Sequence, residues 1–173
     1  KAYYETGIAD WVSPSDMEKN IERAHKWENL LLGKQVPDLA CMDSANVWHN
    51  TRDCNKDFKI LLFWSPGCGH CSVEVPKYDK FYKEKKDIYS VEIFAINTES
   101  DLEAWKKFIK EKDLQWINLN GLVANYDWRE YFDVEKTPIM FILDKNNTIV
   151  AKNVPADNIE QIIKAIKEGK FTY

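Results

Sequence analysis

Residues 63–76 read FWSPGCGHCSVEVP, and this stretch joins three kinds of local structure. Lys59–Trp64 (KILLFW) leads into it and is apolar after its lysine, as expected for a strand buried on both faces of a sheet. Ser65-Pro66-Gly67 predicts a turn. Cys68 to about Lys86 predicts a helix that bends at Pro76, because proline cannot donate its N–H and crowds the preceding turn. The expected order is strand, turn, Cys-x-x-Cys and helix.

Cys68-Gly69-His70-Cys71 opens this helix, and its place there gives the two thiols different chemistry. A helix N-terminus has unpaired N–H groups and the positive end of the helix dipole, and both favour a thiolate over a thiol. Cys68 is therefore the expected exposed nucleophile, with partial positive charge added by His70. Cys71, one turn further on, is the expected buried resolving thiol. The predicted activity is thiol–disulfide exchange, with no metal or organic cofactor, because the electrons reside in the redox-active disulfide Cys68–Cys71.

Other interpretations of the motif are open. A zinc site would need Cys41 and Cys54 as further ligands, but these two do not form a second close pair and the spacing does not resemble a zinc ribbon. A purely structural Cys68–Cys71 bridge would close too short a loop to constrain the unfolded chain. The alternative function is a metal-binding or metal-delivery module that uses Cys68, His70 and Cys71, and it predicts tight metal binding with negligible disulfide reductase activity.

Strands and helices alternate around this motif. The expected strands are short segments around 39–42 and 47–48, followed by 59–64, 89–97, 115–119, 139–144 and 148–152. The expected helices after the N-terminal region are 68–86, 101–112, 126–132 and 157–167. A hairpin turn is expected at Lys145-Asn146-Asn147. This order predicts an α/β sandwich with a mixed central sheet flanked by helices.

The composition fits one globular unit and excludes several classes of protein. Of the 173 residues, 45% are hydrophobic and 13% aromatic, which is enough apolar material for a core and excludes a disordered linker. The net charge of −4 gives no electrostatic reason to expect nucleic acid or an anionic membrane as a partner. The longest apolar runs, Ile60–Trp64 and Ile139–Leu143, are too short for a transmembrane helix.

The N-terminal residues are predicted to form a helical extension. Ser13-Pro14-Ser15-Asp16 is typical of a helix start, and the helix is expected to run to Leu32 and end at Gly33. Its apolar face would consist of Met17, Ile21, Ala24 and Leu31. We therefore divide the chain into an extension, 1–32, that could be the remnant of an upstream domain, and a second domain, 33–173. The start at Lys1 favours a mature form or a fragment whose targeting segment has been removed.

Several of these segments together resemble the thioredoxin superfamily, and more narrowly the TlpA/ResA-like extracytoplasmic thiol-disulfide oxidoreductases. The resemblance covers about four-fifths of the chain. It rests on VPDL at 36–39, the motif segment, Cys71-x-x-Glu74-x-Pro76, AWKKFIKEKDLQWINL at 104–119, and Thr137-Pro138 before IMFILD. It implies a thioredoxin-like fold, protein thiols or disulfides as substrates, and a membrane or periplasmic redox partner. The implied location is extracytoplasmic, either periplasmic or membrane-tethered through a missing N-terminal segment.

The resemblance also implies roles for residues outside the motif. Pro138 aligns with the cis-proline that lies against the active-site disulfide of this superfamily, where it leaves the Thr137 backbone free to pair with an extended substrate. Glu74 follows Cys71 by one turn, and in relatives a Glu at this place helps to manage the proton of the buried thiol. The expected catalytic residues are Cys68, Cys71 and Glu74, supported by Gly69, His70, Trp64, Thr137 and Pro138.

Two positions depart from the family pattern. Gly67 replaces the Trp that is usual before the first Cys, so one wall of the substrate groove is expected to be more open. The Gly69-His70 dipeptide is that of protein disulfide isomerases. It predicts a reduction potential less reducing than the roughly −270 mV of thioredoxin and nearer the isomerase value of about −180 mV.

Cys41 and Cys54 flank the segment MDSANVWHNTRD, which could fold as a hairpin and bring the two thiols together. A structural disulfide between them is expected in an oxidising compartment. Two free buried thiols, or a secondary redox relay or metal role, are the alternatives.

Overall fold

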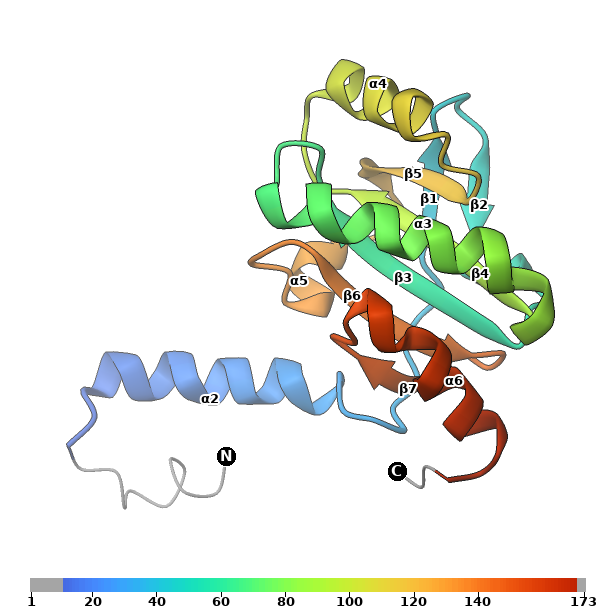
Figure 1. Cartoon of the computed structure of the whole chain (residues 1–173). Helices are drawn as coiled ribbons and strands as arrows, with labels where there is room; N and C mark the ends of the chain where they lie inside the picture. Colours follow the sequence, from blue (N-terminus) through green and yellow to red (C-terminus); the bar gives the residue numbers. More distant parts are fainter. Residues whose placement is uncertain (1–10, 171–173) are drawn as a thin grey trace.

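The computed structural model describes residues 11–170 and contains one seven-stranded sheet (Figure 1). The strands are β1 Ala40–Asp43, β2 Trp48–Asn50, β3 Phe58–Trp64, β4 Val91–Asn97, β5 Ile117–Ala124, β6 Ile139–Asp144 and β7 Ile149–Lys152. Their order across the sheet is β2-β1-β5-β4-β3-β6-β7. The strands β3, β4 and β5 pair in parallel and the other neighbours pair antiparallel. The predicted mixed sheet is confirmed.

Helices cover both faces of the sheet (Figure 1). The helices α3 Gly69–Tyr89, α4 Leu102–Lys112 and α6 Ile159–Lys167 pack on one face, and the short α5 Trp128–Phe132 packs on the other. Two 3-10 turns complete the unit, η1 Thr51–Asp53 and η2 Ala156–Asn158. α3 continues through Pro76 as a single helix. Among the helices of residues 11–170, none has both the length and the apolar character that crossing a bilayer requires.

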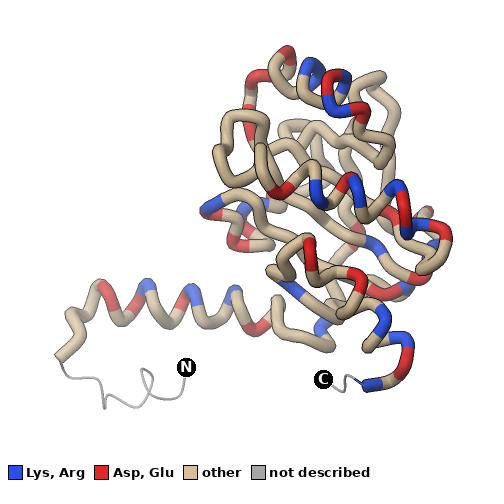
Figure 2. Tube along the Cα trace, in the orientation of Figure 1, with Lys and Arg blue, Asp and Glu red and all other residues tan. Residues whose placement is uncertain are grey.

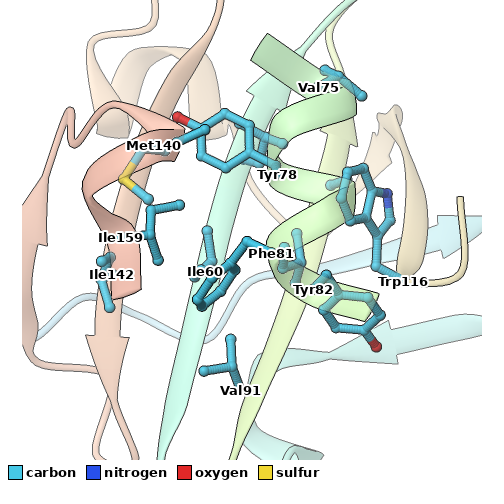
Figure 3. Packing of buried hydrophobic residues seen from close by; sticks show 14 of the residues in the cluster. Ile60, Val75, Tyr78, Phe81, Tyr82, Val91, Trp116, Met140, Ile142 and Ile159 are labelled. Carbon is cyan, nitrogen blue, oxygen red and sulfur yellow. The ribbon is translucent and has the colours of Figure 1, made fainter. Parts of the chain in front are cut away.

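The strand β3 lies in the middle of the core. Its alternate side chains enter two different apolar clusters: Ile60, Leu62 and Trp64 contact the α3 side, and Leu61 and Phe63 contact the α5 side. All five are fully buried. This two-sided burial explains why the strand is an unbroken apolar run rather than an alternating one. Figure 3 shows the first cluster, in which aromatic side chains of α3 lie over β3 and its neighbours.

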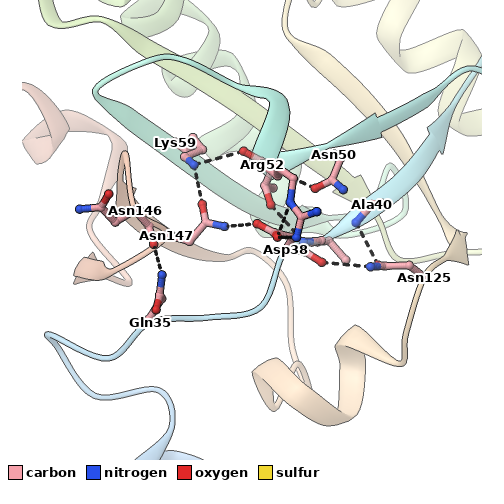
Figure 4. Close-up of polar contacts among 11 residues, drawn as sticks. Gln35, Asp38, Ala40, Asn50, Arg52, Lys59, Asn125, Asn146 and Asn147 are labelled. Carbon is pink, nitrogen blue, oxygen red and sulfur yellow. Dashed lines mark hydrogen bonds and ion pairs between the residues drawn. The ribbon is translucent and has the colours of Figure 1, made fainter.

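Lys59 is the exception within this strand, since its side chain is only 1% exposed. Its ammonium donates to the carbonyls of Thr51, at 3.1 Å, and Lys145, at 3.2 Å, and to the side chain of Asn147 (Figure 4). Asn147 in turn donates to Asp38 at 2.7 Å. The lysine therefore links the β6–β7 turn to η1. This network lies at the opposite end of β3 from Cys68 and Cys71.

The N-terminal helix α2, Pro14–Glu28, begins as predicted, with the Ser13 side chain accepting from the Asp16 amide. It ends at Glu28 rather than at Leu32, and it contains no buried residue. Of the predicted apolar face, Met17, Ile21 and Ala24 are only partly buried, and Leu31, beyond the helix, is 49% exposed. Figure 2 shows charged residues of both signs along α2. Ion pairs of Arg23 and Lys26 link the helix to the α5 region.

Three contacts fix α2 to the segment that precedes β6. Arg23 forms ion pairs with Asp133 and Glu135, and the Trp27 indole donates to Asp133 at 2.7 Å. The first core residue along the described chain is Leu30, at 3% exposure. The predicted division at residue 32 stays a prediction, and residues 1–10 of the expected extension lie outside the described part of the chain.

Several strand boundaries differ from those predicted, and two of the differences have a clear structural cause. β5 begins at Ile117 and continues to Ala124, instead of ending at Leu119, because Asn120 and Ala124 pair with β1. β4 begins at Val91 rather than Tyr89, because Ser90 adopts the left-handed backbone conformation, φ 55°, that ends α3. Both differences arise from long-range pairing or helix capping, which the local pattern does not contain.

Candidate active site

The candidate active site lies where β3 passes into α3. Trp64 is the last residue of β3, and its carbonyl accepts from the Thr98 amide at 2.9 Å, which ties the end of β3 to the end of β4. Cys68 is the N-cap of α3, with an extended backbone of φ −82° and ψ 118°. Its sulfur accepts from the Cys71 amide at 3.2 Å. The first unpaired amides of the helix therefore point at Cys68, as the sequence predicts.

The two thiols lie in different environments. Cys71 is fully buried in the apolar cluster on the α3 side, whereas Cys68 is partly exposed at its edge. Both are free, so the structure shows the dithiol form of the pair. The Cys68 thiol donates to the carbonyl of Thr137 at 3.1 Å. This bond places the segment before β6 directly beside the first cysteine.

Their environments shift the two pKa values in opposite directions. Burial, the largest single influence on Cys68, acts to raise its pKa, but hydrogen bonds from Cys71, from the Thr137 side chain and from the amides of Cys71 and His70 outweigh it and lower the pKa overall. Burial raises the pKa of Cys71 to about 12, and its hydrogen bond with Cys68 acts in the same direction. Cys68 is thus the thiol that ionises more easily.

The peptide bond between Thr137 and Pro138 is cis. These two residues lie in the segment between α5 and β6, and both are partly exposed. The structure thus brings Thr137 and Pro138, which are distant from the motif in sequence, to the same place as Cys68. The Thr137 carbonyl contacts the sulfur of Cys68 as a hydrogen-bond acceptor.

Trp64 is a buried aromatic residue at the end of β3, next to the motif. It is fully buried, and its ring lies 5.0 Å from that of Phe108 in α4, between centroids. It belongs to the same apolar cluster as Cys71. Its indole N–H has no hydrogen-bond partner among residues 11–170. Trp64 therefore contributes to the buried cluster that contains the Cys71 thiol.

Gly69 and His70 are both exposed in the first turn of α3. A Cβ on Gly69 would meet no atom within 4 Å, so packing does not require glycine there. The backbone amide of His70 contributes to lowering the pKa of Cys68. The structure therefore assigns the main chain of His70 to the site, and the predicted contribution of its ring stays a prediction.

The Glu74 carboxylate points toward the C-terminal part of the fold. It forms an ion pair with Lys77 at 2.9 Å and accepts from the Ala156 amide at 3.4 Å. No hydrogen bond among residues 11–170 joins it to either thiol. Burial and then the negative charges of Glu74 and Cys71 raise the pKa of the Tyr78 phenol. The polar contacts of Glu74 within residues 11–170 are thus with Lys77 and Ala156, and its predicted role toward the buried thiol stays a prediction.

Cys41 and Cys54 are free thiols in this structure, in contrast to the predicted disulfide. The predicted hairpin does form, but its register places His49, rather than Cys54, opposite Cys41. Cys54 follows η1, beyond the end of the hairpin. Within residues 11–170, no three His, Cys, Asp or Glu side chains are grouped closely enough to hold a metal ion, so the four-cysteine zinc set is not assembled there.

One neighbour of the motif was missed by sequence reasoning. A Cβ on Gly67 would lie 3.1 Å from a carboxylate oxygen of Glu99, so that carboxylate lies against the residue before Cys68. The replacement of the usual Trp by Gly67 predicts that one wall of the substrate groove is more open. The sequence alone does not show which side chain faces that position.

The comparisons with known proteins agree with this arrangement. The sequence profile of a family described as Thioredoxin-like matches residues 56–149, more than half of the chain. "Thioredoxin-like protein YneN" of Bacillus subtilis is 27% identical over 123 residues, which are 68% of each chain.

Two solved structures are similar over most of the described chain. A domain of a possible thiol-disulfide isomerase from Cytophaga hutchinsonii is 30% identical, with a TM-score of 0.74 over 81% of this chain and 95% of that one. A thiol:disulfide interchange protein from Bacteroides sp. is 25% identical, with a TM-score of 0.69 over 80% of this chain and 94% of that one. The seven-stranded mixed sheet, the helices on its two faces and the matched profile lead to one conclusion: the chain belongs to the Thioredoxin-like family.

Proposed function

We propose that this chain is a thiol-disulfide oxidoreductase that exchanges disulfides with protein substrates through Cys68 and Cys71. The observation that supports this most directly is the opposite shift of two adjacent thiols: the pKa of Cys68 is lowered, and that of Cys71 is raised to about 12. Perturbed pKa values at neighbouring groups are typical of functional sites. The names of the two similar structures, an isomerase domain and an interchange protein, support the same activity.

In the reducing direction, the Cys68 thiolate attacks one sulfur of a substrate disulfide. A Cys68–substrate S–S bond forms, the substrate S–S bond breaks, and the other substrate sulfur leaves as a thiolate. Cys71 then loses its proton and attacks Cys68, which releases the second substrate thiolate and leaves a Cys68–Cys71 disulfide. Two electrons pass from the dithiol to the substrate. The oxidising direction runs the same steps backwards.

The supporting residues have distinct proposed roles. Thr137 and Pro138 form the wall on one side of Cys68, and Thr137 provides backbone to which an extended substrate can pair. Trp64 belongs to the buried cluster around Cys71 and is proposed to help exclude water from it, and Gly69 and His70 provide the exposed turn over which a substrate passes. Glu74 is proposed to receive the Cys71 proton through water, because it follows Cys71 by three residues on α3 and no hydrogen bond among residues 11–170 joins it to the thiol.

The direction of electron flow, the partner and the location follow as further proposals. The Gly69-His70 dipeptide supports an oxidising or isomerising role. The resemblance to TlpA/ResA-like proteins supports an extracytoplasmic location, with a membrane or periplasmic redox partner. The measured reduction potential of the Cys68–Cys71 pair tests the first of these: a value as low as that of thioredoxin, about −270 mV, would contradict it.

Insulin reduction with dithiothreitol as electron donor tests the activity itself. Cys68→Ser should lose turnover, and Cys71→Ser should accumulate a mixed disulfide with the substrate that is visible by mass spectrometry. Cys54→Ser, which removes a thiol outside the motif, should retain turnover. Activity that survives Cys68→Ser, or tight stoichiometric binding of copper or zinc with no reductase activity, would contradict the proposal and favour the metal-delivery alternative.

A further inference from the structure

Glu99 lies against the residue that precedes the first cysteine. A Cβ built on Gly67 would be 3.1 and 3.2 Å from the two carboxylate oxygens of Glu99. Gly67 is not among the described glycines with a positive φ, so its backbone does not require glycine. The absence of a side chain at position 67 therefore leaves space for this carboxylate, one residue away from the sulfur that reacts.

The position of Glu99 is fixed by the same strands that carry the motif. Asn97, at the end of β4, is fully buried and pairs with Trp64 in the sheet. Its side-chain amide donates to the Glu99 carbonyl at 2.7 Å, and its side-chain oxygen accepts from the Glu99 amide at 3.3 Å. Figure 1 shows the β4–α4 connection beside the β3–α3 connection. A buried side chain thus holds the backbone of an exposed acidic residue next to Cys68.

The charge of Glu99 is not neutralised within the described chain. Glu99 is exposed, and no ion pair among residues 11–170 includes it. Arg129 of α5 reaches the residue before Glu99: its guanidinium donates to the Thr98 carbonyl and lies 4.3 Å from the centroid of the Trp128 ring. Arg129 is therefore held to the main chain and to an aromatic ring, and the Glu99 carboxylate stays available to a ligand.

We propose that Glu99 is a specificity-determining residue that favours substrates with Lys or Arg beside the reacting cysteine. This inference rests on the proposed function. Thr137 contacts the Cys68 sulfur, and Gly67, which faces the Glu99 carboxylate, directly precedes Cys68; a side chain next to a substrate cysteine bonded to Cys68 would therefore pass that carboxylate. An exposed charge pair of this kind changes a rate constant by about two- to fivefold, and the effect decreases with added salt.

Two short peptides test the proposal. They are identical except for Lys or Glu on both sides of a single cysteine, which carries thionitrobenzoate in a mixed disulfide. The Cys68 thiolate attacks the peptide sulfur and releases the coloured thionitrobenzoate anion, because the thiol of lower pKa leaves faster. The measured quantity is the ratio of the second-order rate constants for the Lys and Glu peptides, at low and at high salt.

The reduced wild-type protein should prefer the Lys peptide by about fivefold at low salt. Glu99→Gln should bring the ratio close to one, and Glu99→Lys should invert it. Glu84→Gln makes the same charge change on α3, about 24 Å further along the helix, and should keep the wild-type ratio. Equal rates for the two peptides in the wild type, or a ratio unchanged by Glu99→Gln, would overturn the proposed role of Glu99 and leave the proposed function standing. Absence of thionitrobenzoate release from either peptide would overturn the proposed function and this inference with it.

Discussion

The two thiols of the motif should differ strongly in their reactivity toward iodoacetamide, because the thiolate is the reacting species. With a pKa of about 12, Cys71 is a thiolate in only about one molecule in 10⁵ at about pH 7. The pKa of Cys68 is lowered from an ordinary value of 9.0, at which a thiol is about 1% thiolate under the same conditions. The two thiolate populations therefore differ by at least about 10³-fold.

A second effect acts in the opposite direction. The intrinsic nucleophilicity of a thiolate rises with its pKa with a slope of about 0.4–0.5, so the smallest pKa difference, about 3 units, favours the Cys71 thiolate by about 15- to 30-fold. The difference in thiolate population is larger, and the net preference for Cys68 is at least about 30-fold. The complete burial of Cys71 increases this preference further, because iodoacetamide must reach the sulfur.

The assay follows each cysteine separately by peptide mass spectrometry after timed alkylation of the fully reduced protein. Cys41 is an internal reference, because burial raises its pKa to about 12 as well. In denaturant all four cysteines should react at similar rates, which shows that the difference belongs to the fold. The rate for Cys71 should increase about tenfold per pH unit up to its pKa. Rates for Cys68 and Cys71 within tenfold of each other in the native protein would refute the reasoning.

Three other predictions follow from the contacts described. Lys59→Met leaves three acceptors, two of them buried, without their donor and should lower the free energy of unfolding by about 2–4 kcal/mol in urea titrations. It should leave the alkylation rate of Cys68 unchanged, and a loss under about 0.5 kcal/mol would contradict the proposed role of this network. Thr137→Val removes the side-chain hydrogen bond that lowers the Cys68 pKa, so the midpoint of the alkylation rate against pH should rise, whereas Thr137→Ser should keep it. Oxidation of the native protein with glutathione disulfide should form one intramolecular bridge and leave Cys41 and Cys54 as thiols, so a mass consistent with two bridges would contradict the separation seen here.

The parts of the structure that the sequence predicts are those that depend on neighbouring residues. The apolar run before the motif, the turn at Ser65-Pro66-Gly67 and the helix that follows lie within one short segment, and each has its own local signal. The N-cap at Ser13 is of the same kind. The position of Cys68 at a helix start was therefore predictable before any long-range contact was known.

The parts that could not be predicted depend on segments distant in the sequence. The extent of β5 is determined by its pairing with β1, and the separation of Cys41 from Cys54 is determined by the register of the β1–β2 hairpin. The carboxylate of Glu99 reaches Gly67 only because β3 and β4 end side by side. Periodicity and turn residues contain no information about such pairings.

The spacing of the two cysteines explains why one strand–helix junction produces two such different thiols. Cys68 is still outside the helix, in extended backbone, so its sulfur turns back toward the unpaired amides. Three residues later the chain has completed most of a turn of 3.6 residues, and Cys71 faces the sheet on the same side as Val75 and Tyr78. A spacing longer by one or two residues would place the second thiol at Ser72 or Val73, both of which are exposed. The difference in pKa therefore comes from where each sulfur lies relative to the first helical turn, and a cysteine moved to either of these exposed positions would lose the burial that raises the pKa of Cys71.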